Sequence, residues 1–167
     1  VAVNRDVPTP FGWWLGGDDA GYSDPTLGVL RIDSADGQPL AVAMDYGVQS
    51  SVLDFSVDAK GRRLVSADLA GAAARAIEAR YPGATALFLV GAAADQAPYL
   101  QANRHVVGPD GTAARLDIHD AGLDLLTLQG ERLGQDALRT VAAIAPDTAP
   151  TLQIVRKTVQ VSTQTGV

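Results

Sequence analysis

The sequence contains no cysteine and only two histidines among its 167 residues. Without thiols, the chain can form no disulfide bond, no thiolate zinc site and no cysteine nucleophile, and the redox compartment is left open. Apolar runs are short, and none approaches the roughly 18 residues that a membrane-spanning helix requires. The opening segment VAVNRDVPTP lacks the basic start and apolar block of a signal peptide, so the sequence assigns no localisation.

Positive charge is also scarce. Thirteen Lys and Arg residues stand against 19 Asp and Glu residues, and the formal net charge is −6 with a pI near 4.7. Proteins that bind a phosphate backbone need clustered basic residues, so a nucleic-acid partner is not expected. Hydrophobic residues make up 47% of the chain. This composition and length suit one domain over residues 1–167 with a substantial core.

Local patterns predict a strand hairpin early in the chain. Residues 1–25 are rich in Gly, Pro and Asp and are expected to be irregular. Trp13 and Trp14 form either an apolar wall for a ligand or an anchor for this loop, and the anchor is the favoured interpretation. TLGVLRID and QPLAVAMDYG then alternate as strands around Asp36-Gly37, a strong hairpin turn signal.

The rest of the chain alternates between helix and strand. SADLAGAAARAIEARYPG predicts a helix capped by Ser66 or Asp68, and its small residues suggest close packing against a sheet. TALFLV predicts a strand buried on both faces. The remaining expectations are a loop around 58–61, little assignable structure over 99–126, a helix over 130–145 and a half-exposed strand over 150–163. The fold class is therefore α/β, a mixed sheet with an antiparallel hairpin and covering helices.

Several short segments stand in a distinctive order. They are Asn4-Arg5, DPTLGVLRID from Asp24, MDYGVQSSVL from Met44, SADLAG from Ser66 and GAAADQAP from Gly91. Together they resemble the neutral/alkaline non-lysosomal ceramidase family and its bacterial relatives. The resemblance extends over about residues 2–161. It implies the middle portion of that family's catalytic domain, so the single domain is expected to belong to a larger one.

The resemblance implies a zinc amidohydrolase, in which the metal polarises an amide carbonyl and activates water. Zinc is therefore the cofactor expected for the family, and family members are often exported. Gln49 stands where the family word N-Y-A-C-H-P-T-V-L has its zinc-binding histidine. Ala97 stands where ceramidases carry a serine, which argues against ceramide as the substrate. No metal ligand is assigned in this chain, and no cofactor is expected for this chain alone.

The resemblance also selects the candidate site residues. Asp95 and Gln49 are the candidates at the catalytic position, and Arg5 and Gly91 are the candidates for binding substrate. Asp95 orients a metal ligand or simply caps a turn, and the two interpretations carry equal weight. Arg5 binds polar substrate groups or belongs to the scaffold. Gly91 and the alanines after it keep the site wall low, so that a ligand can approach the backbone.

Other candidate sites are weaker. His105 and His119 could suggest a metal site, but histidines in a poorly patterned polar segment are usually solvated. Ser50 and Ser51 lie outside any Gly-x-Ser-x-Gly elbow, so a serine-hydrolase triad is not expected. GAAAD does not match the dinucleotide fingerprint Gly-x-Gly-x-x-Gly.

The leading hypothesis is a ceramidase-like zinc amidohydrolase domain with impaired or altered catalysis. One alternative is an active metal-dependent hydrolase portion, completed by a missing segment and acting on a non-ceramide amide. The other is a non-catalytic binding or structural module. A small-molecule or lipid-like amide is the expected ligand, and the sequence leaves the oligomeric state open.

Overall fold

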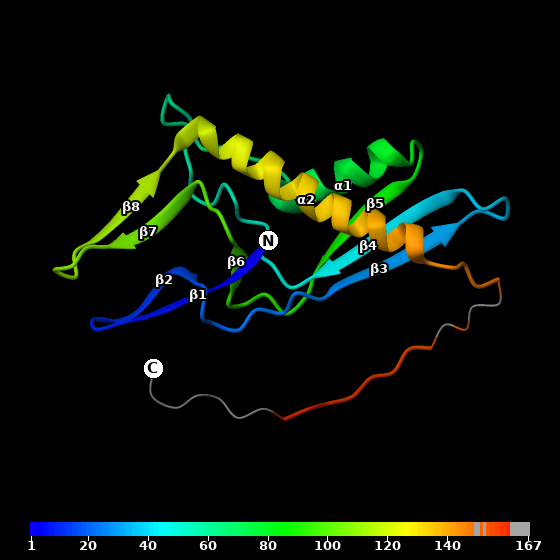
Figure 1. Ribbon diagram of the computed structural model, residues 1–167, viewed down its shortest axis with the longest axis horizontal. Helices are drawn as coiled ribbons and strands as arrows, with labels where there is room; N and C mark the ends of the chain where they lie inside the picture. Colours follow the sequence, from blue (N-terminus) through cyan, green and yellow to red (C-terminus); the bar gives the residue numbers. More distant parts are fainter. Residues whose placement is uncertain (149–150, 152, 161–167) are drawn as a thin grey trace.

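The computed structural model describes residues 1–148, 151 and 153–160 (Figure 1). Its strands are β1 (Ala2–Thr9), β2 (Gly12–Asp18), β3 (Leu27–Asp33), β4 (Pro39–Tyr46), β5 (Thr85–Val90), β6 (Gln96–Pro98), β7 (Asn103–Val107) and β8 (Ala113–Asp117). Its helices are α1 (Asp68–Arg80), the short 3-10 helix η1 (His119–Ala121) and α2 (Gly122–Ala143). The predicted α/β class, with a mixed sheet and covering helices, is confirmed.

The sheet of β3, β4 and β5 carries the core. β3 pairs antiparallel with β4, and the predicted turn contains Gly37 in a left-handed conformation with φ of 82°. β4 then runs parallel to β5, with α1 as the connecting crossover. On one face of this sheet, Val42 and Met44 are fully buried in a core that also contains residues of both helices.

The helices α1 and α2 lie on the same side of this sheet and pack closely against each other (Figure 1). Glycines of α2 meet alanines of α1 at the contact. A Cβ added at Gly130 would lie 2.1 Å from the Cβ of Ala72, and one at Gly134 would lie 2.4 Å from that of Ala76. The small residues of α1 therefore serve a close helix–helix approach as well as packing against the sheet.

The opposite face of the sheet is apolar and open among the described residues. The prediction that TALFLV is buried on both faces is wrong, because Leu87 is 50% and Leu89 55% exposed. β5 is an edge strand rather than a central one. Leu30 of β3 lies on the same open face. It pairs with Ala43 of β4, and Ala43 pairs in turn with Leu87 of β5. A continuous apolar run does not reveal whether its second face is covered.

A second sheet begins at the N-terminus, where the prediction of an irregular segment is wrong. β1 and β2 form an antiparallel hairpin, and β1 also pairs with β6. Glycine and proline, which usually indicate loops, lie here within the two strands and at the turn between them. Of the two tryptophans, only Trp14 anchors the hairpin, with its ring edge-on to His105 at 5.8 Å between centroids. Trp13 points the other way and is 70% exposed.

The segment 99–126, for which the sequence suggested little, contains the hairpin of β7 and β8. This hairpin contacts the first one at their tips, because a Cβ added at Gly111 would lie 3.0 Å from the Phe11 ring. The following helix α2 begins at Gly122, well before the predicted start at Gly130, and ends at Ala143. The turn around 58–61 agrees with the predicted loop.

The end of the chain departs from the predicted strand over 150–163. Residues 151 and 153–160 form no strand and are exposed, while positions 150, 152 and 161–163 lie outside the described residues. Alternation alone predicted a strand there, but a strand needs a partner edge, and none of the described strands pairs with this segment. Among the described helices, none has the length and apolar character needed to cross a membrane.

Candidate functional site

A small depression lies where the second sheet meets the β7–β8 hairpin. Its volume is about 50 Å³. The residues that line it are Arg5, Leu15, Gly16, Gln49, Asp54, Ala97, Gln101, Asn103, His105 and Arg115. They come from both hairpins, from β6 and from the loops after β4 and β6. Three positions that the sequence singled out, Arg5, Gln49 and Ala97, therefore share one wall.

Arg5 enters the depression from β1. A guanidinium nitrogen, Nη1, donates to Gln49 Oε1 at 3.3 Å, and the Arg5 backbone N–H donates to the Asp95 carbonyl at 2.8 Å. Its Nε is buried and has no hydrogen-bond partner. Asp6 provides the nearest carboxylate, at 3.7 Å and half exposed. The positive charge of Arg5 thus faces a neutral carboxamide more closely than it faces any anion.

Gln49 lies in the loop after β4 and connects this loop by hydrogen bonds to the loop before β6. Its Nε2 donates to the carbonyls of Ala93 at 2.9 Å and Ala94 at 3.0 Å. Its backbone N–H donates to the Gln96 carbonyl at 3.0 Å. With Oε1 accepting from Arg5, both ends of the carboxamide are engaged, so the side chain acts as a fixed clamp between the two loops.

This arrangement does not fit zinc. Gln49 Oε1 is the one atom of that side chain able to ligate a cation, and it accepts a hydrogen bond from a guanidinium. A positive charge at that point repels a divalent cation. Among the described residues, no group of three His, Asp or Glu side chains is arranged to hold a metal ion.

Asp95 and Gly91 lie beside the depression rather than on its lining. The Asp95 carboxylate accepts a hydrogen bond from Asn4 Nδ2 at 2.9 Å, which fastens the loop to β1. Gly91 packs against the end of β4, where an added Cβ would lie 3.0 Å from Asp45 Oδ1 and 3.3 Å from the Gly47 nitrogen. Glycine at position 91 thus allows a tight approach to the end of β4, and the functional roles of both residues stay predictions.

Two carboxylates, the buried Asp68 and the partly buried Asp117, hold the loop that carries Gln49. Asp68 accepts hydrogen bonds from the backbone N–H groups of Val52 at 2.7 Å and Leu53 at 2.9 Å. Asp117 accepts from Ser56 Oγ at 2.7 Å and from the Val57 N–H at 3.0 Å. Burial acts to raise the pKa of Asp117, but these hydrogen bonds and that of the His119 N–H outweigh it, so the pKa lies below its usual value.

Backbone strain gathers around the same loop. Phe55, Asp68 and His119 are the non-glycine residues with positive φ in the described part of the chain, at 53°, 47° and 53°. Phe55 lies in the loop, Asp68 binds its backbone, and His119 Nδ1 lies 3.0 Å from the Val57 carbonyl oxygen. Such conformations persist only where surrounding contacts over-determine them, and they gather at functional sites.

The two histidines have different environments. His119 is held beside Asp117, with its Nδ1 3.7 Å from Asp117 Oδ2. His105 lines the depression and packs on Trp14, so it is partly buried rather than simply solvated. Among the described residues, neither histidine belongs to a group of three side chains arranged to hold a metal ion.

Sequence reasoning missed the β7–β8 side of the depression, including Asn103 and Arg115. Arg115 Nε donates to Asn103 Oδ1 at 2.8 Å, and its guanidinium carbon lies 5.0 Å from the centre of the Phe55 ring. Asp110-Gly111 lies between the two strands, the same turn signal as Asp36-Gly37. That signal would have identified the hairpin and hence its inward-facing residues.

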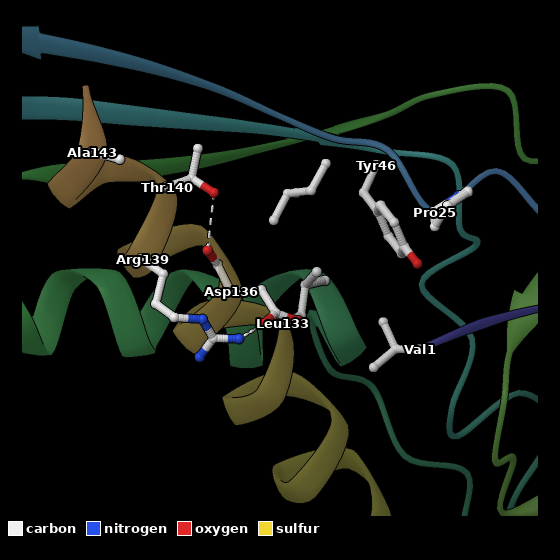
Figure 2. Close-up of a pocket in the computed structure, with 9 residues that line it drawn as sticks. Val1, Pro25, Tyr46, Leu133, Asp136, Arg139, Thr140 and Ala143 are labelled. Carbon is white, nitrogen blue, oxygen red and sulfur yellow. Dashed lines mark hydrogen bonds and ion pairs between the residues drawn. The ribbon is translucent and has the colours of Figure 1, made fainter. Parts of the chain in front are cut away.

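A wider groove of about 560 Å³ lies elsewhere, between α2 and the start of β3 (Figure 2). Tyr46, Leu133 and Val1 contribute much of its apolar wall, and Arg139 pairs there with Asp136. Burial is the main cause that raises the pKa of Tyr46. The groove contains none of the predicted site residues, so the smaller depression remains the candidate site.

No family model and no curated protein sequence matches this chain. Solved structures do resemble it. The neutral ceramidase from Pseudomonas aeruginosa matches with a TM-score of 0.53 and 22% identity over 83% of this chain. A ceramidase complexed with C2 matches with the same TM-score and coverage at 21% identity. This chain covers 20% of the length of each of these structures. At this identity the comparison establishes a ceramidase-like fold.

Proposed function

We propose that this chain is a ceramidase-like amidohydrolase domain in which zinc-dependent hydrolysis is impaired or altered, and that its depression binds a small amide-bearing molecule. The observation that carries the proposal is the hydrogen bond of 3.3 Å between Arg5 and Gln49. In the resemblance, Gln49 replaces a zinc-binding histidine. The replacement leaves a guanidinium bonded to the side chain that would otherwise face the metal.

The remaining polar groups suit an amide. An amide offers one carbonyl acceptor and one N–H donor. Arg5 and Arg115 supply donors around the depression, and Asp54 and Gln101 bring acceptor oxygens to its lining. Ala97 is 2% exposed and contributes no hydroxyl where ceramidases carry a serine. We therefore expect amide binding without hydrolysis of ceramide.

One further observation supports an active alternative. The chain spans only 20% of the length of the solved ceramidases, so a longer polypeptide could bring ligands that this chain lacks. In that case the domain would be part of a metal-dependent hydrolase that acts on a non-ceramide amide. A purely structural role is the other alternative, supported by Gln49 having all its side-chain polar atoms bonded within the protein.

Zinc binding and amide binding together distinguish these functions. The purified chain would be titrated with zinc by calorimetry, alongside a Gln49→His variant. Amide binding would be followed through the backbone NMR signals of Arg5, Gln49 and Ala97 during titration with N-methylacetamide. We expect no stoichiometric zinc in the wild-type chain, shifts at those signals, and no fatty acid released from ceramide above a no-protein control.

Each contrary result identifies a different error. A zinc dissociation constant below about 1 μM for the wild-type chain, together with amide hydrolysis, would favour the active alternative. Zinc binding by Gln49→His only in a longer polypeptide would favour completion by another segment. Absence of any amide-induced shift would leave the structural module.

A further inference from the structure

Positive charge gathers in the depression although the whole chain carries a net charge of −6. Two arginines, Arg5 and Arg115, line it together with a single carboxylate, Asp54. None of the ion pairs in the described part of the chain joins Asp54 to either arginine, or Arg115 to any carboxylate. Arg5 has the half-exposed Asp6 carboxylate at 3.7 Å, so the charge of Arg115 is the one left for a ligand to neutralise.

The unused hydrogen-bonding capacity has the same character. Asn103 is already bonded at both ends, because its Nδ2 donates to the Phe55 carbonyl and its Oδ1 accepts from Arg115. Gln49 is likewise engaged at both ends. Arg115 uses only Nε in hydrogen bonds, so the two terminal nitrogens of its guanidinium keep their donors. The terminal nitrogens of Arg115 therefore offer charged donors to an incoming group, beside the acceptor oxygens of Asp54 and Gln101 on the same lining.

Arg115 is also held in place before any ligand arrives. Its Nε donates a hydrogen bond to Asn103 Oδ1 at 2.8 Å, and its guanidinium carbon lies 5.0 Å from the centre of the Phe55 ring. The Phe55 ring also contacts Arg63, whose guanidinium carbon lies 5.3 Å from the ring centre. A planar guanidinium fixed through Nε presents its outer nitrogens as a fork, which matches the two oxygens of a carboxylate.

The geometry points to a carboxylate-binding subsite, in which Arg115 and Arg5 bind the carboxylate of a small amide-bearing acid of the N-acyl amino acid class. The volume of about 50 Å³ suits a small polar group rather than a long acyl chain. The inference rests on the proposed amide binding for the rest of the ligand, but carboxylate recognition itself requires neither metal nor hydrolysis.

The test compares three probes on the folded chain: N-acetylglycine, its uncharged analogue N-acetylglycinamide, and acetate. Binding is measured by NMR titration at two salt concentrations. We expect N-acetylglycine to bind at least about tenfold more tightly than N-acetylglycinamide, because a guanidinium forms stronger hydrogen bonds with a carboxylate than with a neutral amide. The preference should weaken as salt rises, since screening reduces the attraction.

Arg104 provides a matched control. It neighbours His105 on β7 and is exposed, as Arg115 also is, but it is absent from the lining of the depression. Arg115→Gln should raise the dissociation constant for N-acetylglycine about tenfold. Arg104→Gln removes the same charge and should change that constant less than about twofold. Arg115→Lys should restore only part of the affinity, because an ammonium group cannot form the fork.

The outcomes separate the subsite from the proposed function. Equal binding of N-acetylglycine and N-acetylglycinamide overturns the carboxylate subsite and leaves amide binding intact. Acetate binding as tightly as N-acetylglycine supports the subsite and overturns the amide proposal. If Arg115→Gln and Arg104→Gln lose equal affinity for N-acetylglycine, net charge explains the effect and the subsite is overturned. If no probe binds, both the subsite and the amide proposal are overturned. The wild-type comparison of probes decides the question even if Arg115→Gln fails to fold.

Discussion

The buried carboxylate of Asp68 provides a sharp test of how the loop that carries Gln49 is held. Asp68 Oδ1 accepts from the N–H groups of Val52 and Leu69, both at 2.7 Å, and Oδ2 accepts from Leu53 at 2.9 Å. The residue is 9% exposed and has φ of 47°. Asparagine tolerates that left-handed conformation, so Asp68→Asn changes the hydrogen bonding with little added backbone strain.

The expected loss of stability in Asp68→Asn follows from the loss of one acceptor oxygen. If the amide oxygen of asparagine takes the place of Oδ1, the N–H groups of Val52 and Leu69 keep their partner. The amide nitrogen then faces the Leu53 N–H, donor against donor, and leaves that buried group unpaired. An unsatisfied buried group costs about 1–3 kcal/mol, and the two retained bonds lose their charge assistance. We expect a loss of about 2–4 kcal/mol in the free energy of unfolding.

Urea denaturation and amide hydrogen exchange would measure this effect. Asp45→Asn is the control, because Asp45 is exposed on β4 and should lose less than about 0.5 kcal/mol. Exchange at Val52 and Leu53 should accelerate in Asp68→Asn, while exchange in β3 and β4 should follow only the change in global stability. A cost under about 0.5 kcal/mol with unchanged protection at Leu53 would refute the assigned role of Asp68.

Two further predictions concern the open sheet face and the stability of the fold at acidic pH. Leu87→Thr should cost less than about 1 kcal/mol because Leu87 is 50% exposed, whereas Met44→Thr, at 0% exposure, should cost about 3 kcal/mol or more in urea unfolding. Similar costs would mean that the Leu87 face is covered in solution. The pKa of Asp117 is lowered on folding, so its stabilisation is complete above about pH 4 and is lost as pH falls through the folded pKa. The stability difference between wild type and Asp117→Asn should therefore shrink below about pH 4, and a difference that stays constant from pH 5 to pH 2 would contradict this.

The sequence predicted well those elements that are specified by local signals. The Asp36-Gly37 turn and the alternation around it correctly placed the β3–β4 hairpin, and the helix from Asp68 was also correct. Its predicted cap was wrong, because Ala67 occupies the N-cap position without a side-chain capping hydrogen bond, in place of Ser66 or Asp68. Local signals failed where glycine and proline lie within strands, as in β1 and β2. Alternation over 150–163 predicted a strand, but pairing depends on a free edge that local sequence does not describe.

The neighbourhood of the site was predicted through the resemblance rather than through physical patterns. The order of segments placed Arg5, Gln49 and the loop after β5 together, and hydrogen bonds among them agree with that placement. No sequence pattern indicated that Asp95 would turn toward Asn4, or that Gly91 would pack against Asp45. Those orientations depend on contacts between segments that are far apart in the chain.

The sequence by itself determined the α/β class, the absence of thiol chemistry, and the carboxamide at position 49, because composition and residue identity do not depend on folding. Only the tertiary structure decided that Gln49 is bonded to a guanidinium, since Arg5 approaches it from a different strand. Only the tertiary structure joined Arg115 to the same depression, because packing of Trp14 against His105 brings the β7–β8 hairpin beside the N-terminal hairpin. Charges and hydrogen-bond donors form a site through such proximity, which the linear order of residues does not contain.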